Sequence, residues 1–143
     1  MLTSSQVHLI QDSFATAVSH RDDLITDFYQ SLFAKAPSVR SMFPDDLSTQ
    51  SKMLASTLHF AVQKLENVEA LIEPLRTLGA KHAGYGAEAA HYAVVAEVLV
   101  DRLENAVGDA WTPEHTQAWN DALTIIAQTM LEGAAAVETT AHA

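Results

Sequence analysis

The stretch FYQSLFAKAPSVRSMF, residues 28–43, decides the fold class of this chain. In its first half, apolar side chains return every three or four positions, which is the period of an amphipathic α-helix. Extended back to Ile25, this apolar stripe has the following members: Ile25, Phe28, Tyr29, Leu32, Phe33 and Ala36. Pro37 cannot continue the helix and begins a short helical turn that ends near Phe43. The pattern therefore predicts a helix over about 22–36.

The helical period continues through almost the whole chain, and no segment alternates in the manner of a β-strand. We predict an all-α protein that forms a single domain over 1–143, with a tail at 136–143 that frays. A capping box opens the first helix at Thr3. Further helices are expected at about 22–36, from Asp46 or Ser48 to about 66, then at 68–83, 87–107 and 113–135, with a stop at Gly84 and Gly86. Pro74 leaves open whether its segment is one helix or two pieces.

Charge and composition exclude several classes of partner. The chain has 8 basic and 18 acidic residues and a net charge of −10, so phosphate backbones and anionic lipids repel it, whereas a basic redox protein would be attracted. Cysteine is absent, which excludes disulfides and thiolate sites. The start of the chain has no basic and apolar leader, and no apolar run approaches the roughly 18 residues of a membrane span. We therefore expect a cytoplasmic protein without nucleic-acid or membrane partners.

One polar residue interrupts each of three apolar helix faces. His82 closes the stripe formed by Leu71, Leu75 and Leu78, Gln50 stands in the stripe of Leu47, Leu54 and Leu58, and Tyr29 lies within the stripe of 25–36. Each has an ordinary explanation, because a buried histidine or tyrosine can bond a backbone carbonyl and a glutamine in the first turn can face solvent. Taken together, they suggest a shared polar or ligand-filled cavity. An imidazole can hold an iron, and two hydrogen-bond donors can stabilise the partial negative charge on bound oxygen.

Two motifs give the chain a recognisable resemblance. They are the stretch 28–43, and Lys81-His82 followed ten residues later by His91-Tyr92. On these residues the chain resembles the globin family, and more specifically the haem domain of flavohaemoglobins and their single-domain bacterial relatives, from Thr3 to about Leu131. The resemblance implies haem b within a three-over-three helical sandwich. Only about four residues separate Phe43 from the next helix, so the D helix of some globins is short or absent.

The resemblance also assigns roles to particular positions. It implies that His82 is the proximal ligand of the haem iron and that Tyr29 and Gln50 hydrogen-bond the bound ligand on the distal side. The haem pocket would then include the following residues: Phe43, Leu54, Leu78, Lys81, Tyr92, Val95 and Ile126. Lys81 either reaches a haem propionate or is solvated.

The chain departs from flavohaemoglobins on the proximal side and at its end. Flavohaemoglobins place a glutamate near the proximal imidazole, but this chain has Ala134 there, and Glu132 points about 200° away on an ideal helix. We therefore expect the His82 imidazole to donate its N–H to the Leu78 carbonyl. The chain ends where a flavin and nicotinamide reductase would begin, so an oxygenase cycle would need an electron donor in trans.

Reversible binding of dioxygen is the function that these residues favour, with nitric oxide, carbon monoxide and sulfide as other ligands. The alternative is an enzyme, a nitric-oxide dioxygenase or weak peroxidase that needs a separate reductase. Two further functions are less favoured. A haem-free helical regulator would not need His82, Phe43 and Gln50, and a haem-based sensor normally requires an attached output domain, for which 143 residues leave no room. The sequence leaves open the ligand in the cell, the oligomeric state, the electron donor, and whether water, Tyr29, Gln50 or Lys52 lies near the open iron position.

The remaining histidines and aromatic residues are expected to be structural. His59 lies about 180° around its helix from Gln50 and so cannot be a second axial ligand. His91 is predicted to lie at the surface or between helices, and Trp111 to hold the start of the last helix. Solvated positions are predicted for His8, His20, His115 and His142, and packing roles for Tyr85 and Trp119.

Overall fold

The computed structural model describes residues 2–84 and 88–142, with side chains up to 135. The described residues form helices and no strand, in agreement with the predicted class. The elements in chain order are α1 Ser4–His20, α2 Leu24–Lys35, η1 Pro37–Met42, α3 Ser48–Gln63, η2 Lys64–Asn67, α4 Glu69–Gly84, α5 Ala89–Val107, η3 Gly108–Ala110 and α6 Pro113–His142. Tyr85 and Gly86, for which packing and helix-stopping roles were predicted, lie outside the described residues.

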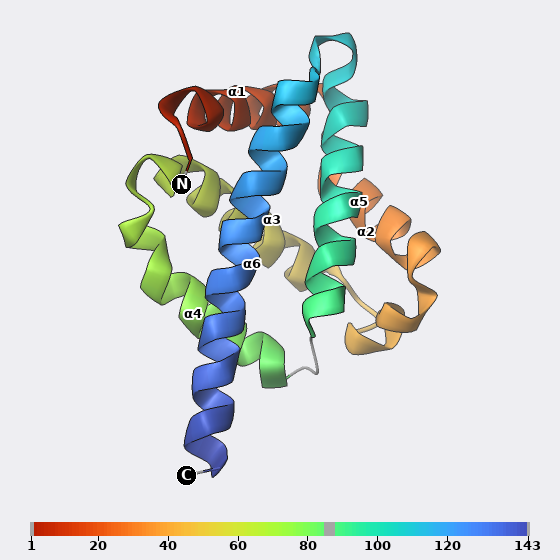
Figure 1. Cartoon of the computed structure of the whole chain (residues 1–143). Coiled ribbons are helices and arrows are strands. Elements are labelled where there is room, and N and C mark those ends of the chain that lie inside the picture. Colours follow the sequence, from red (N-terminus) through yellow and green to blue (C-terminus); the bar gives the residue numbers. More distant parts are fainter. Residues whose placement is uncertain (1, 85–87, 143) are drawn as a thin grey trace.

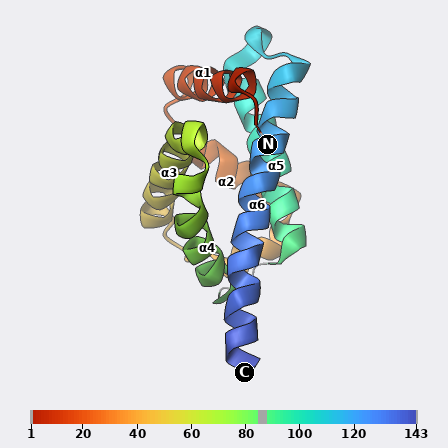
Figure 2. The ribbon, with the colours of Figure 1, turned by 60° about the vertical axis from the view of Figure 1, so that its left-hand side comes forward.

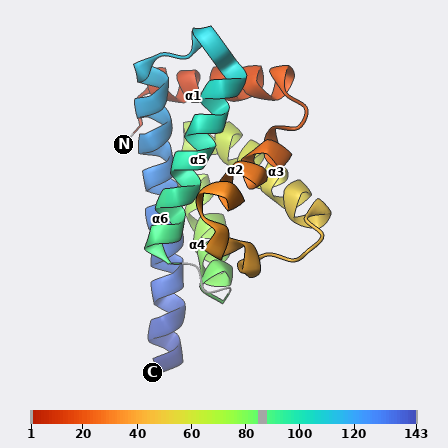
Figure 3. The ribbon, with the colours of Figure 1, turned by 90° about the vertical axis from the view of Figure 1, so that its right-hand side faces the viewer.

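The helices form the predicted three-over-three arrangement, with α1, α3 and α4 over α2, α5 and α6. Helices α5 and α6 run side by side, and α1 crosses them near one end (Figure 1). Helix α4 packs along α6, and α3 lies beside α1 (Figure 2). Figure 3 shows α2 and α3 together on one side of the molecule and α6 on the other. No helix forms between η1 and α3, as the short spacing predicts. None of the helices in the described ranges is long and apolar enough to cross a membrane.

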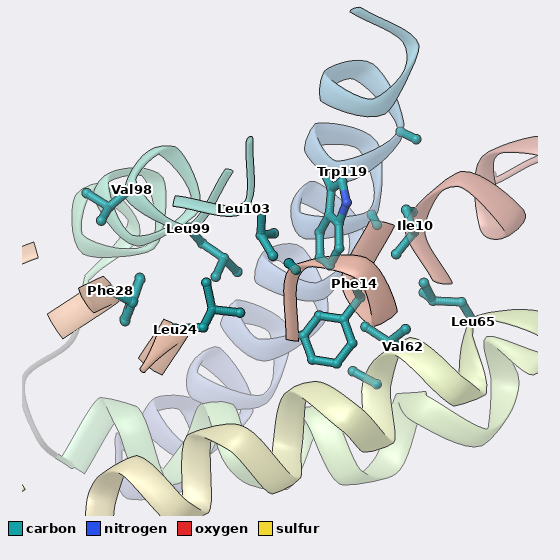
Figure 4. Close-up of a cluster of buried hydrophobic side chains, with 14 of the residues drawn as sticks. Ile10, Phe14, Leu24, Phe28, Val62, Leu65, Val98, Leu99, Leu103 and Trp119 are labelled. Atoms are coloured by element: carbon teal, nitrogen blue, oxygen red, sulfur yellow. The ribbon is translucent and has the colours of Figure 1, made fainter. Parts of the chain in front are cut away.

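The core is centred on Trp119 of α6, which points toward Phe14 of α1 (Figure 4). The Trp119 indole N–H donates a hydrogen bond to the Ser13 hydroxyl at 2.9 Å, and both side chains are buried. A buried indole needs such an acceptor, because its unpaired N–H would be costly. Leu99 and Leu103 of α5 complete this part of the core. The packing role predicted for Trp119 is confirmed.

Helix ends agree with the sequence at some positions and differ at others. Thr3 forms the predicted capping box with Gln6. Neither Asp46 nor Ser48 is the N-cap of α3, which is Leu47. The Asp46 carboxylate instead accepts hydrogen bonds from the Ser48 N–H and hydroxyl, at 3.0 and 2.6 Å, and these bonds lower its pKa.

Three further helix boundaries follow from the structure. Helix α3 ends at Gln63 and continues as the turn η2, so the predicted end near 66 includes this turn. Pro74 lies inside α4, which is one helix rather than two pieces. Helix α6 continues past 135 to His142, and fraying of this tail stays a prediction.

Helices α4 and α6 cross at close range because each carries a glycine at the contact. A Cβ atom added to Gly79 would lie 1.8 Å from the Met130 carbonyl oxygen, and one added to Gly133 would lie 2.0 Å from the Arg76 carbonyl oxygen. Real Cβ contacts of this kind do not occur, because both obstacles are backbone atoms that cannot rotate away. The two glycines therefore let the backbones touch, and they hold α4, the helix of His82, against α6.

A nearly buried carboxylate joins α2 to α5. Asp27 accepts from Arg21 at 3.1 Å and from Arg102 at 3.5 Å, and its side chain is 11% exposed. We expect Asp27→Ala to lower the free energy of unfolding by about 2 kcal/mol, because two arginines lose a charged hydrogen-bond partner. Urea denaturation measures this difference.

Asp23 provides the matched control for Asp27. It also pairs with Arg21, at 2.7 Å, but its side chain is 60% exposed. An exposed ion pair contributes only about 0–1 kcal/mol, so Asp23→Ala should change stability less than Asp27→Ala. Equal losses in the two variants would show that the burial of Asp27 has no energetic consequence.

Candidate functional site

Tyr29 and Gln50, predicted as distal residues, come together in the structure. Tyr29 lies on α2 and is 4% exposed. Burial raises the pKa of its hydroxyl, and the nearby Gln50 side chain, in the first turn of α3, lowers this pKa by less. The net shift is upward, so the phenol keeps its proton at neutral pH and can donate it in a hydrogen bond.

Aromatic rings surround Tyr29 on its other sides. Phe33 stacks on it at 5.8 Å between ring centroids, Phe43 contacts it edge-on at 5.7 Å, and Phe28 does so at 5.3 Å. Phe43 comes from the loop between η1 and α3, so two separate segments, α2 and this loop, supply the rings. Such packing restricts the phenol ring to one orientation.

His82 lies in the last turn of α4 and is half-buried. Its Nδ1 atom is 2.8 Å from the Leu78 carbonyl oxygen, which is the bond that the sequence predicted. A carbonyl oxygen can only accept, so in the neutral ring Nδ1 carries the hydrogen and the lone pair resides on Nε2. This is the arrangement of a histidine that binds a metal through Nε2 while its other nitrogen bonds a carbonyl.

The stripe that leads to His82 becomes more exposed along α4. Leu71 and Leu75 are buried, at 2% and 5% exposure, whereas Leu78 and His82 are half-buried. Tyr92 of α5 lies beside His82, with ring centroids 6.2 Å apart. Burial raises the pKa of the Tyr92 hydroxyl, so it too stays protonated. The apolar stripe of α4 thus begins in the core at Leu71 and ends at the half-buried side chain of His82.

The apolar residues predicted to line the pocket are exposed to a similar extent. All six large apolar members are half-buried and pack against the core, namely Phe43, Leu54, Leu78, Tyr92, Val95 and Ile126. They come from the 43–47 loop and from α3, α4, α5 and α6. Helix α3 packs against α1 and α2, whereas α4 packs against α6, so the walls on α3 and on α4 belong to two helices that do not pack closely on each other. Lys81, the predicted propionate partner, is exposed near the end of α4.

Glu132 does not contact His82. Its carboxylate pairs with Arg76 of α4 at 3.2 Å, on an exposed surface. The glycine contacts pair Gly79 with Met130 and Arg76 with Gly133, which makes α4 and α6 antiparallel and places Glu132 beside Arg76, more than a turn before His82. Ala134 has no carboxylate to offer. These contacts place Glu132 away from His82, and the missing proximal glutamate stays a prediction from the sequence.

Several of the other predicted roles can be compared with the structure. His59 packs edge-on against Phe14 of α1 at 4.9 Å, consistent with its predicted position away from Gln50. Trp111 donates to the Thr116 hydroxyl at 2.8 Å and so holds the start of α6, as predicted. His20 and His115 are not merely solvated, because their Nδ1 atoms bond the Ala106 carbonyl at 2.9 Å and the Thr112 N–H at 3.0 Å.

Three residues that contribute to the site escaped sequence reasoning. Gly79 and Gly133 position α4, and Arg40 binds the loop that carries Phe43. A glycine inside a helix costs about 1 kcal/mol relative to alanine. The presence of Gly79 and Gly133 within helices could therefore have indicated a close contact between helices. Arg40 had no signal, because an arginine between two helices is usually solvated.

Comparison with known proteins agrees with this geometry. The globin family model matches residues 26–130, and the chain belongs to the globin family. It is 25% identical to a flavohaemoprotein of Bacillus subtilis over 92% of this chain and 34% of the relative. The chain thus spans about a third of the length of the flavohaemoprotein. It is 28% identical to an anaerobic nitrite reductase of rice, Oryza sativa subsp. indica, over 91% of this chain and 94% of the relative.

Solved structures show the same fold. An engineered carbene transferase from Rhodothermus marinus superposes with a TM-score of 0.86, at 26% identity and full coverage of both chains. A bacterial globin from Campylobacter jejuni superposes with a TM-score of 0.82, at 24% identity, over 96% of this chain and 99% of the other. Globins fold around a haem pocket, so the family implies haem binding.

The residues present fit a haem. The donor set comprises an imidazole whose Nδ1 is already bonded to a carbonyl, which suits one axial iron ligand. Half-buried apolar side chains from four helices and a loop suit a flat apolar macrocycle, because large apolar surface left partly exposed marks a binding site. Tyr29 and Gln50 add polar groups that can bind a small ligand.

Proposed function

We propose that this chain is a haem-binding globin that takes up dioxygen reversibly and releases it slowly. Haem supplies an iron with one position open to a diatomic ligand. His82 is the proposed proximal ligand through Nε2, and Tyr29 and Gln50 are the proposed hydrogen-bond donors to the ligand. The observation that carries this proposal is the buried hydroxyl-bearing ring of Tyr29, which lies near Gln50 and packs against Phe33 and Phe43.

The other site residues have supporting roles in this proposal. The Leu78 carbonyl holds the His82 ring in one tautomer and one orientation. Phe43, Leu54, Leu78, Tyr92, Val95 and Ile126 would contact the macrocycle, and Lys81 would bind a propionate at the exposed edge. The cofactor is haem b, since covalent attachment in the c-type manner needs cysteines and the chain has none.

Dioxygen is the proposed ligand, and nitric oxide, carbon monoxide and sulfide are the others that this pocket suits. Reversible binding requires a ferrous iron, and we propose that a separate reductase keeps it so. A chain with a net charge of −10 attracts a donor with a basic docking face. A cytoplasmic location stays a prediction from the sequence.

Nitric-oxide dioxygenase or weak peroxidase activity is the second candidate. The similarity to a flavohaemoprotein favours it. The predicted absence of a proximal glutamate weighs against strong oxygen activation, and Glu132 is engaged with Arg76. Nitrate formation from nitric oxide with an added reductase distinguishes the two functions.

Absorption spectra of the purified protein test the proposal directly. The ferric form, the ferrous form and the ferrous form under dioxygen should give three distinct haem spectra, and removal of dioxygen should restore the ferrous spectrum. A protein that takes up no haem from solution would contradict the proposal.

Tyr29→Phe should raise the rate of dioxygen release by about 10- to 100-fold. A hydrogen bond to a charged acceptor contributes about 1.5–3 kcal/mol, and each 1.4 kcal/mol corresponds to a factor of about ten. The change removes one oxygen atom and keeps the ring that Phe33 and Phe43 contact. Stopped-flow mixing with carbon monoxide as the replacing ligand measures the rate.

Thr124→Val is the control, because it also removes a hydroxyl, but one that bonds the Asn120 carbonyl on the exposed face of α6. We expect it to leave the release rate nearly unchanged. If Tyr29→Phe releases dioxygen as slowly as the original protein, Tyr29 has no part in holding the ligand.

A further inference from the structure

Arg40 of η1 binds three successive backbone carbonyls with one side chain. Its Nη1 donates to the carbonyl oxygens of Phe43 at 3.3 Å and Pro44 at 3.0 Å, and its Nη2 donates to that of Asp45 at 3.2 Å. These carbonyls belong to the 43–47 loop, which has no helix of its own to satisfy them. The planar guanidinium has five N–H donors in a fixed fork, and so it can serve all three.

The same guanidinium lies over the ring of Phe33. The Arg40 Cζ atom is 5.0 Å from the ring centroid, which is within the range of a cation–π contact. Phe33 belongs to α2, the helix that carries Tyr29. The described partners of Arg40 are therefore carbonyls and a ring rather than carboxylates, and its side chain ties α2 to the 43–47 loop.

The two aromatic residues that Arg40 links, Phe33 and Phe43, both contact Tyr29. Phe33 and Phe43 lie 5.4 Å apart, and each lies within 5.8 Å of the Tyr29 ring. The 43–47 loop then leads directly into α3, where Gln50 stands in the first turn. A shift of the loop would thus move both Phe43 and the start of α3.

We propose that Arg40 is a positioning residue for the distal side of the ligand site. By holding the 43–47 loop against Phe33, it keeps the Tyr29 hydroxyl and the Gln50 side chain in the orientation that retains the ligand. This inference rests on the proposed function, because it takes Tyr29 as a ligand donor. Arg40 itself touches neither the ligand nor the haem in this proposal.

Hydrogen exchange of the loop tests the first half of the inference. In Arg40→Met, the backbone amides of Phe43, Asp45, Asp46 and Leu47 should exchange about tenfold faster or more, because the three hydrogen bonds that oppose local opening of the loop are lost. Lys35→Met is the matched control. It also removes one positive charge, but Lys35 pairs with Glu97 on an exposed surface. Unchanged exchange in Arg40→Met would overturn the proposal. This measurement needs no haem.

A double-mutant cycle on dioxygen release tests the second half. Arg40→Met should raise the release rate about three- to tenfold when Tyr29 is present, and change it little in the Tyr29→Phe background, because the two residues act as one unit. Arg40→Lys should restore only part of the effect, since an ammonium lacks the fork, and it serves in place of Arg40→Met if that variant fails to fold. If Arg40→Met changes the dioxygen release rate by the same factor with Tyr29 present and in the Tyr29→Phe background, the role of Arg40 is overturned and the proposed function stays intact. A release rate that Tyr29→Phe leaves unchanged would overturn the proposed function and, with it, the role of Arg40 in ligand binding.

Discussion

His82→Ala protein should lose the haem spectrum of the original protein and bind haem at least about 100-fold more weakly. Removal of residues that merely support a metal ligand costs about 10- to 100-fold in affinity, and this change removes the proposed ligand itself. The half-buried position of His82 limits the structural damage, because the shortened side chain can be replaced by water. Haem titration followed by absorbance measures the affinity, and added imidazole should restore part of the original spectrum.

His59→Ala is the control for His82→Ala. His59 is exposed on α3 and packs against Phe14 of α1, so its removal should leave haem affinity and spectrum unchanged. If His82→Ala binds haem with the original spectrum and affinity, another residue is the axial ligand and the proposed function loses its central residue.

Gly79→Ala should lower the free energy of unfolding by about 3 kcal/mol, the upper part of the range for overpacked sites. The new Cβ would lie 1.8 Å from the Met130 carbonyl oxygen and 2.6 Å from the Met130 Cα. No rotation relieves contacts between backbone atoms, so α4 and α6 must move apart. The roughly 1 kcal/mol that alanine gains in helix propensity offsets only part of this cost. Urea denaturation of the haem-free protein measures the loss, and because α4 carries His82, haem affinity should fall as well.

Gly84→Ala is the matched control for Gly79→Ala on the same helix. A Cβ at Gly84 meets nothing within 4 Å, and the residue does not have a positive φ. Alanine there should be neutral or stabilise the protein by about 0.4–1 kcal/mol. Equal stabilities of the Gly79→Ala and Gly84→Ala proteins would mean that the crossing of α4 and α6 adapts without cost.

The features predicted correctly from the sequence are local ones. The Thr3 capping box involves residues three positions apart, and the contact of Trp111 with the start of its helix involves residues five positions apart. The bond between His82 and the Leu78 carbonyl spans one helical turn. The position of His59 away from Gln50 also follows from the helical period alone. Short-range geometry is nearly independent of the rest of the fold, and for this reason a linear pattern predicts it.

The features that were missed depend on neighbours far along the chain. Gly79 meets Met130, and Gly133 meets Arg76, which no pattern within either helix contains. Arg40 lies close in sequence to the carbonyls it binds, but its contact with Phe33 depends on how α2 meets the 43–47 loop. The N-cap of α3 is a local exception, because the Asp46 carboxylate accepts hydrogen bonds from Ser48, two positions later, and Leu47 becomes the N-cap.

The amino-acid sequence by itself determined the helical class, the apolar faces and the three polar residues that interrupt them. These follow from the 3.6-residue period, which a chain displays without any tertiary contact. Only the tertiary structure decided that Tyr29 and Gln50 come together, and that α4 lies against α6 with its backbone in contact. The physical reason is that such contacts depend on the distance and angle between helices, which the side chains of both partners set together.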